Sequence, residues 1–474
     1  MSPKSIAFCG ASNNFMKMGT TQLFNLVHGG YQGKIYPIHP NEETVLGLKA
    51  YKSFNDLPEV PDLVFIVLPT RLVVDFIQQA GEFGIQRAII VSAGFSEVGK
   101  EDLTEELRKM AEKYQIKFLG PNCIGIMNNS SNLNLTWFPI NSQNHHGGKI
   151  SIASESGSWS CHIYPYCEER GIKLNKTISV GNSISLDVID CLEYFGEDPD
   201  TKVIGVYIEG LKPGRGRRFV EICKKITKTK PIIALYAGGT EAGSRAGQSH
   251  TASLGGSQEI YSAVFRECGV IQADSIEELL DFVHAFAVTP LPRGSRMAIH
   301  TLGGGPAVSY ADASEKVGLS VPVFSNELQS RLKELGLPST AIIKNPVDVT
   351  FDMNLDRFYQ NIPRLIIDSK EVDGLLMYGV FGTLIFEMIQ GRAPNIDSIP
   401  LEPLQAMFEA ALPKFAEFVK QSNFPVIVCS LMSRKDDAIA YIQDNDIAVF
   451  PSPLRAAKAM KALFNYYNYR KKNL

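Results

Sequence analysis

The chain has 474 residues, of which 45% are hydrophobic and 20% charged, and a formal net charge of −3. That length is enough for roughly three ordinary domains, each with its own core. The near-neutral net charge gives no indication of the basic surface that binds nucleic acid. No apolar run approaches the roughly 18–20 residues that cross a bilayer. We therefore expect a cytoplasmic globular protein that binds neither nucleic acid nor a membrane.

The eight cysteines are scattered along the chain and form no CxxC pair. Several lie within apolar runs, which favours buried reduced thiols over disulfides. The same spacing does not fit a zinc site, and no metal site is predicted.

Residues 1–130 alternate short apolar runs with amphipathic stretches, which is typical of a parallel sheet with crossover helices. Strands are expected at 6–9, 34–37, 63–68, 88–91 and 117–119, and helices at 20–27, 72–84 and 103–114. The ends of parallel strands share one edge, where α/β folds bind nucleotides. The sequence therefore predicts a Rossmann-like first domain.

The turn after the first strand reads GASNNFMKMG and contains Gly10 and Ser12. It does not match the GxGxxG fingerprint, and the second strand leads into Ile38-His39-Pro40 where an acidic ribose partner would stand. A nucleotide still fits this edge, whereas an NAD-dependent dehydrogenase is disfavoured. A tight turn without a ligand remains the alternative for Gly10 and Ser12.

The alternation starts again over residues 147–290, after a polar junction at 144–148. Strands are expected at 149–153, 177–180, 203–208, 231–236 and 270–272. If these strands are parallel, the turns at 154–157, 181–182 and 209–210 converge with the glycine-rich loop 237–256.

Three features of these turns suggest one chemistry. His250 in the loop can act as a nucleophile, because imidazole is largely uncharged near neutral pH. Ser156 and Gly157 lie where a helix should begin, and amides and hydroxyls there attract phosphate. Glu209 ends an apolar strand, where its carboxylate can accept a hydrogen bond from the imidazole. This set suggests phosphoryl transfer through a phosphohistidine.

Each feature also has a structural explanation. The loop could simply turn the chain, Ser156 and Gly157 could cap a helix, and Glu209 could be an exposed charge.

Residues 295–474 follow a linker at 289–294 and predict a third α/β domain. Strands are expected at 297–301, 320–324, 374–379, 425–430 and 447–450. The glycines of 303–306 precede a helix and could hold a phosphate or the acyl group, or form a tight turn without a ligand. The segment 383–402 has no regular period.

Eight motifs carry a family resemblance. They are SIAFCGAS, GFSEVG, GPNCIG, SESGSW, GNSISLDVIDCLEYFGEDPDTKVIGVYIEG, AGQSHTASLGG, GGGPAVSYADASEKVG and KNPVDVT. In this order they resemble the alpha subunit of ADP-forming acetyl-CoA synthetases, which are NDP-forming acyl-CoA synthetases related to the succinyl-CoA synthetase alpha subunit. The resemblance covers nearly the entire chain and implies a Rossmann-like CoA-binding domain followed by two flavodoxin-like domains.

The resemblance also implies roles for particular residues. His250 would be phosphorylated, Glu209 would orient it, and Ser156 and Gly157 would bind the phosphate. The loops that bind coenzyme A would contain Gly10, Ser12, Pro69, Ser92 and Asn122.

The substrates would be acyl-CoA and phosphate. The chain lacks the further residues of an ATP-grasp domain, so the resemblance implies a hetero-oligomer whose separate ATP-grasp beta subunit holds ADP or ATP with Mg²⁺.

Three positions depart from the family pattern: Ala252, Gly255 and Glu155. Ala252 stands where glycine is usual, which restricts the backbone after His250. Glu155 replaces the common glutamine and adds a carboxylate beside the predicted phosphate site. A CoA-binding or regulatory protein that has lost catalysis therefore remains the rival hypothesis.

Overall fold

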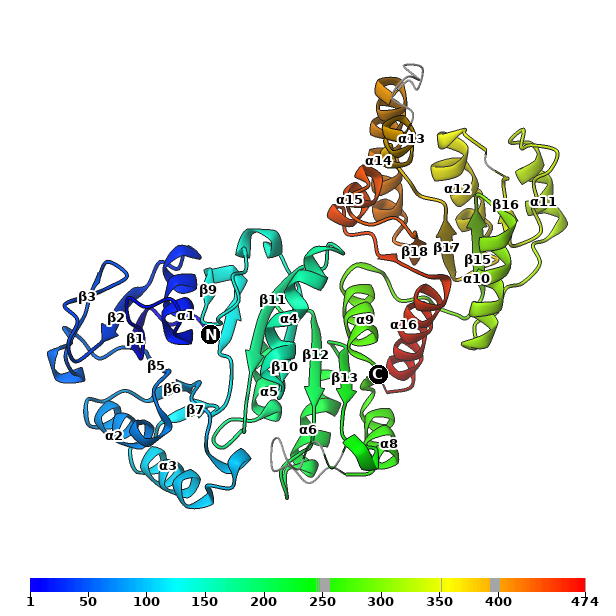
Figure 1. The fold of residues 1–474 in the computed structure, drawn as a ribbon. Coiled ribbons are helices and arrows are strands. Elements are labelled where there is room, and N and C mark those ends of the chain that lie inside the picture. Colours follow the sequence, from blue (N-terminus) through cyan, green and yellow to red (C-terminus); the bar gives the residue numbers. More distant parts are fainter. Residues whose placement is uncertain (244, 246, 248–255, 351, 393–400, 474) are drawn as a thin grey trace. The chain divides into compact units, whose positions relative to one another are not determined.

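The computed structural model describes residues 1–474 except 244, 246, 248–255, 351, 393–400 and 474. The chain divides into two compact units. One comprises Met1–Glu168 with Lys173–Leu279, and the other comprises Glu169–Ile172 with Leu280–Leu474. Helices flank three parallel or mostly parallel sheets (Figure 1). The predicted α/β fold class is confirmed, while the domain boundaries at 130, 147, 290 and 295 stay a prediction.

The first sheet has the order β2-β1-β5-β6-β7 and is parallel throughout. Its strands are β1 (Ser5–Cys9), β2 (Lys34–Ile38), β5 (Leu63–Ile66), β6 (Arg87–Ile90) and β7 (Lys117–Leu119). The helices between them are α1 (Met18–His28), α2 (Val73–Glu82) and α3 (Glu101–Lys113). Because helices cover such a sheet, its strands are nearly continuous apolar runs, which is why the sequence located all five.

The second sheet belongs to the same unit and has the order β14-β13-β12-β10-β11-β8-β9. Five strands are parallel: β10 (Ile150–Ser154), β11 (Leu174–Ser179), β12 (Val203–Ile208), β13 (Ile232–Tyr236) and β14 (Ile271–Ala273). Their crossover helices include α4 (Gly157–Glu168), α5 (Val188–Glu197), α6 (Gly216–Ile226) and α8 (Gln258–Cys268). The predicted convergence of the strand ends at one edge is confirmed.

Two short antiparallel strands, β8 (Ile126–Asn128) and β9 (Leu133–Asn134), complete that sheet. The sequence did not predict them, because segments of two or three residues carry no readable alternation.

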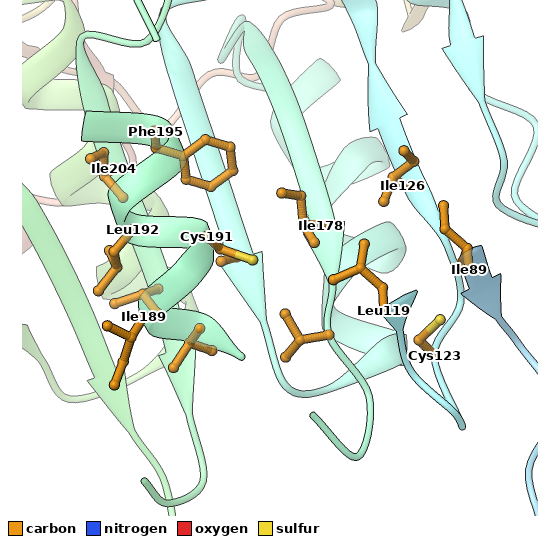
Figure 2. Close-up of a cluster of buried hydrophobic side chains, with 14 of the residues drawn as sticks. Ile89, Leu119, Cys123, Ile126, Ile178, Ile189, Cys191, Leu192, Phe195 and Ile204 are labelled. Carbon is orange, nitrogen blue, oxygen red and sulfur yellow. The ribbon is translucent and has the colours of Figure 1, made fainter. Parts of the chain in front are cut away.

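One hydrophobic cluster joins the two sheets of the first unit. It runs from Ile89 and Leu119 of the first sheet to Ile178 of β11 and to Ile189 and Phe195 of α5 (Figure 2). All of these side chains are buried. The two sheets therefore share one core. Because dense apolar packing tolerates little displacement, this core holds the sheets together.

At the carboxyl ends of these strands, the turn after β11 packs against the loop after β7. Gly181 has a φ of +59°, and a Cβ there would lie 2.4 Å from the carbonyl oxygen of Pro121 and 2.7 Å from that of Asn122. The N–H of Asn182 donates to the Pro121 oxygen at 2.9 Å. The two loops are therefore in direct backbone contact.

The second unit contains a parallel sheet of order β16-β15-β17-β18-β19. Its strands are β15 (Met297–Thr301), β16 (Val347–Asp348), β17 (Gly374–Tyr378), β18 (Val426–Cys429) and β19 (Val449–Phe450). The helices include α10 (Gly304–Lys316), α11 (Asn326–Lys333), α12 (Ile362–Ser369), α14 (Leu401–Ser422) and α16 (Pro453–Asn473). The segment without a regular period contains α13 (Leu384–Arg392), none of whose residues is buried.

The strand expected at 320–324 is wrong. Ser320 forms only an isolated bridge with Arg296, and β16 occupies the place beside β15. Pro322 has no N–H to donate to a ladder, and its carbonyl oxygen accepts instead from the Asn345 side chain at 2.8 Å.

All eight cysteines are free and buried, as expected from the apolar runs around them. Among the described residues, no helix is long and apolar enough to cross a membrane.

We predict that Gly181→Ala lowers the free energy of unfolding by about 2–5 kcal/mol, because the methyl group meets two carbonyl oxygens and the left-handed backbone disfavours alanine. Gly214 is the matched control, with a φ of +81° and no atom within 4 Å of the position that a Cβ would take. Gly214→Ala should cost only the backbone term of about 1–2 kcal/mol. Denaturant titration of both variants measures the difference, and equal losses would contradict the proposed loop contact.

Candidate functional site

A cleft of about 350 Å³ lies at the carboxyl ends of strands from both sheets of the first unit. Its lining comes from Met18, Val67, Leu68, Val91, Ser92, Ala93, Asn122, Cys123, Ile124, Glu155, Ser156, Gly157, Ser158, Gly181 and Asn182. Four residues singled out from the sequence, Ser92, Asn122, Ser156 and Gly157, therefore border one cavity.

Gly10, Ser12, Pro69 and Glu209 do not line this cleft. Gly10 has a φ of +107°, and a Cβ there would lie 2.1 Å from the carbonyl oxygen of Val67, which is itself a lining residue. Ser12 is buried, and its N–H donates to Thr20 Oγ1 at 3.1 Å. Pro69 is exposed in the loop after β5. Gly10 thus allows the first turn to approach the cleft wall, and Ser12 closes that turn onto α1.

The hydroxyl of Ser92 is engaged by the protein itself. It donates to the carbonyl oxygen of Leu68 at 2.6 Å and accepts from the Leu68 N–H at 3.1 Å. Asn122 has a φ of +59°, and its N–H donates to the backbone carbonyl oxygen of Ser92 at 2.9 Å. Its Nδ2 donates to Asn182 Oδ1 at 3.2 Å. These contacts fix the loops after β5, β6 and β7 to one another at the cleft.

The first turn of α4 forms the opposite part of the lining. Ser156, Gly157 and Ser158 stand at its start, where free amides and the helix dipole favour an anion. A Cβ on Gly157 would lie 2.5 Å from Ile124 Cγ1. Glycine therefore lets the helix start pack closely against the loop of the first sheet.

Glu209 follows β12 and is half-buried. Its Oε2 is buried and has no hydrogen-bond partner among the described residues. A buried carboxylate oxygen without a donor is costly, so it provides a place for an N–H group. Burial, together with the Glu209 carboxylate, raises the pKa of the adjacent Tyr207.

The glycine-rich loop begins beside Glu209. Gly238 has a φ of +108°, and a Cβ there would lie 3.3 Å from the Glu209 carbonyl oxygen. His250 and Ala252 themselves lie outside the described residues.

Glu155 lines the cleft and directs one carboxyl oxygen to the backbone that follows β12. Its Oε2 accepts from the N–H of Glu209 and, at 3.2 Å, from that of Gly210. Burial raises the pKa of Glu155 to about 8; the two amides oppose this shift, and the charges of Glu209 and Asp187 reinforce it. The carboxyl group is therefore mostly protonated at neutral pH, and the negative charge expected there from the sequence is largely absent.

Sequence reasoning placed the 181–182 turn at this edge without naming Asn182 as a site residue, and it missed Ile124. Asn182 Nδ2 donates to Glu97 Oε2 at 2.6 Å, which links the turn after β11 to the loop after β6. Both residues stand inside motifs that carried the resemblance, GPNCIG and GNSIS, and their positions after strands were the available signal.

Two family models match the chain. Residues 4–129 match a CoA binding domain, and residues 147–286 match a Succinyl-CoA ligase like flavodoxin domain. These two ranges contain the two walls of the cleft.

Similar proteins and structures extend this match. The alpha subunit of acetate–CoA ligase [ADP-forming] II from Pyrococcus furiosus is 41% identical over 384 residues, which cover 80% of this chain and 82% of that protein. The 4-hydroxybutyrate–CoA ligase [ADP-forming] of Nitrosopumilus maritimus is 34% identical over 82% of this chain and 55% of that protein. The dinucleotide forming acetyl-coenzyme A synthetase 1 of Ca. Korarchaeum cryptofilum, solved with phosphate and ADP, superposes with a TM-score of 0.85 at 31% identity, covering 100% of this chain and 98% of that one.

The family predicted from the ordered motifs is thereby confirmed. Because relatives are named as alpha subunits, a partner subunit is implied. The chain belongs to the alpha-subunit family of ADP-forming acyl-CoA ligases, which are acid–thiol ligases, and it carries that family's CoA-binding domain.

Proposed function

We propose that this chain is the alpha subunit of a reversible ADP-forming acyl-CoA synthetase that works through phosphorylated His250. The observation that carries the proposal is the buried Glu209 Oε2, which has no hydrogen-bond partner among the described residues. Glu209 lies beside Gly238, near the start of the loop whose sequence contains His250. An imidazole N–H donating to this oxygen would leave the other ring nitrogen free to attack phosphorus.

The reaction then runs in three steps. Phosphate attacks the thioester carbonyl of acyl-CoA, the C–S bond breaks, and coenzyme A leaves as acyl phosphate forms. The His250 nitrogen attacks the phosphorus, and the carboxylate leaves with the electrons of the P–O bond. The phosphohistidine finally passes its phosphoryl group to ADP, giving ATP and free imidazole.

The other proposed site residues would supply position and charge rather than covalent chemistry. The α4 amides at Ser156 and Gly157 would hold the phosphate, with the helix dipole favouring its charge. Glu209 would orient His250 and stabilise the imidazole as its charge changes. Gly10, Ser12, Pro69, Ser92 and Asn122 belong to the loops that would hold coenzyme A, through backbone groups at Ser92 because its hydroxyl is already engaged.

We further propose that ADP and Mg²⁺ are held by a separate ATP-grasp beta subunit, so that the active enzyme is a hetero-oligomer. Acetate is the proposed acid, by similarity to the Pyrococcus furiosus relative, and a 4-hydroxybutyrate ligase among the relatives makes a slightly longer acid the alternative.

We predict that incubation with acetyl-CoA and phosphate places one acid-labile phosphoryl group on the wild-type chain, detected by intact mass. His250→Ala should abolish the label, because no other imidazole is proposed as the nucleophile. His146→Ala, at an exposed histidine, is the control and should keep it. An unlabelled wild type would favour a CoA-binding or regulatory role, and a labelled His250→Ala variant would refute this nucleophile.

Glu209→Gln should slow the appearance of the label by about 10–100-fold, since the amide keeps the side-chain shape but loses the charge that orients and supports the imidazole. Quenched-flow mass spectrometry measures the rate, and thermal unfolding verifies that the variant is folded. A label that appears at the wild-type rate would contradict the role of Glu209.

A further inference from the structure

Glu155 connects the anion-binding turn to the end of β12. It lies between β10 and α4 and lines the cleft next to Ser156. Its Oε2 accepts from two successive backbone amides, those of Glu209 and Gly210. The backbone of the residue that would orient His250 is therefore held by a side chain from the turn that would bind phosphate.

The groups that face this carboxyl group come from several elements. They are Glu209 and Tyr207 at the end of β12, Lys212 in the loop that follows, Asp187 at the start of α5, Tyr236 of β13 and Tyr261 of α8. Arg215 offsets the charge of Asp187, because its Nε lies 2.7 Å from Asp187 Oδ2.

Three of these groups are tyrosines that keep their protons through the neutral and mildly alkaline range. Burial is the main cause, raising the pKa of Tyr207 and of Tyr236, and that of Tyr261 to about 12. Burial also lowers the pKa of Lys212. Among the carboxyl groups of this set, Glu155 is the one whose pKa burial raises, to about 8.

We propose that Glu155 is a positioning residue whose protonated carboxyl group clamps the Glu209–Gly210 backbone, and that loss of this proton slows phosphorylation of His250. The inference rests on the proposed function, because that phosphorylation is the step it controls. With Oε2 engaged by two amides, Oε1 carries the proton, and the group matches a glutamine amide in shape, charge and hydrogen bonding.

Deprotonation has a direct electrostatic consequence. An ionised Glu155 would add a second carboxylate beside Glu209 and beside the turn that receives a phosphate anion. Like charges in a partly buried site repel strongly, so phosphate binding and the orientation of Glu209 would both suffer. The site therefore works with Glu155 neutral.

The test compares Glu155→Gln with the wild type in the rate of His250 phosphorylation by acetyl-CoA and phosphate between pH 6 and 10. We expect similar rates below pH 7. Above about pH 8, the ratio of the variant rate to the wild-type rate should rise about tenfold per pH unit, as the wild type loses its active form. Titration of phosphate and of coenzyme A affects both proteins alike and cancels in the ratio.

Two further variants sharpen the test. Glu155→Ala should be slow at every pH, because the amides of Glu209 and Gly210 lose their acceptor. Glu97→Gln is the matched control, since Glu97 also accepts amides, from Gly94 and Phe95. Burial acts to raise its pKa, but these amides and Asn182 outweigh burial and lower it, so the variant should keep the alkaline limb of the wild type. If Glu97→Gln abolished the fall in phosphorylation rate above about pH 8 as fully as Glu155→Gln does, the assignment of that fall to Glu155 would be overturned.

A second readout needs no activity. The folded protein keeps the Glu155 proton up to about pH 8, whereas an unfolded glutamate loses it near about pH 4.3. Between these values the folded state binds more protons, so the wild-type free energy of unfolding falls as pH rises, and it levels off above pH 8. The melting temperature of Glu155→Gln relative to the wild type should therefore climb from pH 5 to pH 8.

The outcomes separate the two proposals. A wild type that is never labelled at any pH overturns the proposed function. Labelling with a rate ratio that stays flat between pH 7 and 10, or a melting-temperature difference independent of pH, overturns the role of Glu155 and leaves the phosphohistidine proposal standing.

Discussion

The contact between the turn at Gly181 and the loop at Pro121 is the constraint on which the cleft depends. A side chain at Gly181 would displace two carbonyl oxygens, and the Asn182 N–H donates to one of them. Below this contact, Leu119 and Ile178 belong to one buried cluster. The carboxyl ends of the two sheets are thereby held side by side, so that the CoA-binding domain and the flavodoxin-like domain each supply part of the same cavity.

Three glutamates at or next to this cavity differ in the hydrogen bonds that their carboxyl groups receive. Glu97 accepts amides and an Asn182 hydrogen bond that together lower its pKa despite burial. Glu155 also accepts two amides, but burial dominates and raises its pKa to about 8. Glu209 keeps a buried oxygen without a partner among the described residues. Glu97 is thus ionised, Glu155 is mostly neutral, and Glu209 has a carboxylate oxygen open to a donor. The three side chains are chemically identical, so their surroundings account for the difference.

The sequence was most informative where one local pattern decides the structure. The strands of the first sheet are mostly buried apolar runs, although β2, β6 and β7 each begin with an exposed charged residue. Each was located to within a few residues because burial on both faces requires such runs. The prediction failed at 320–324, where apolar residues surround Pro322. It also omitted short strands such as β8, β9 and β16, which have two or three residues each. Pairing of these short strands depends on partners distant in the chain, which no local pattern records.

For the site, the sequence by itself determined the α/β class and, through its ordered motifs, the family. It also proposed His250, Glu209, Ser156 and Gly157 as candidate residues, because turns after parallel strands meet at one edge. Only the tertiary structure decided which of these residues share a cavity, that the Ser92 hydroxyl is occupied by Leu68, and that Glu155 turns toward Glu209 and stays largely neutral. The reason is physical: a carboxyl group's charge and direction depend on burial and on amides brought to it from another strand, and that environment exists only once the chain has folded.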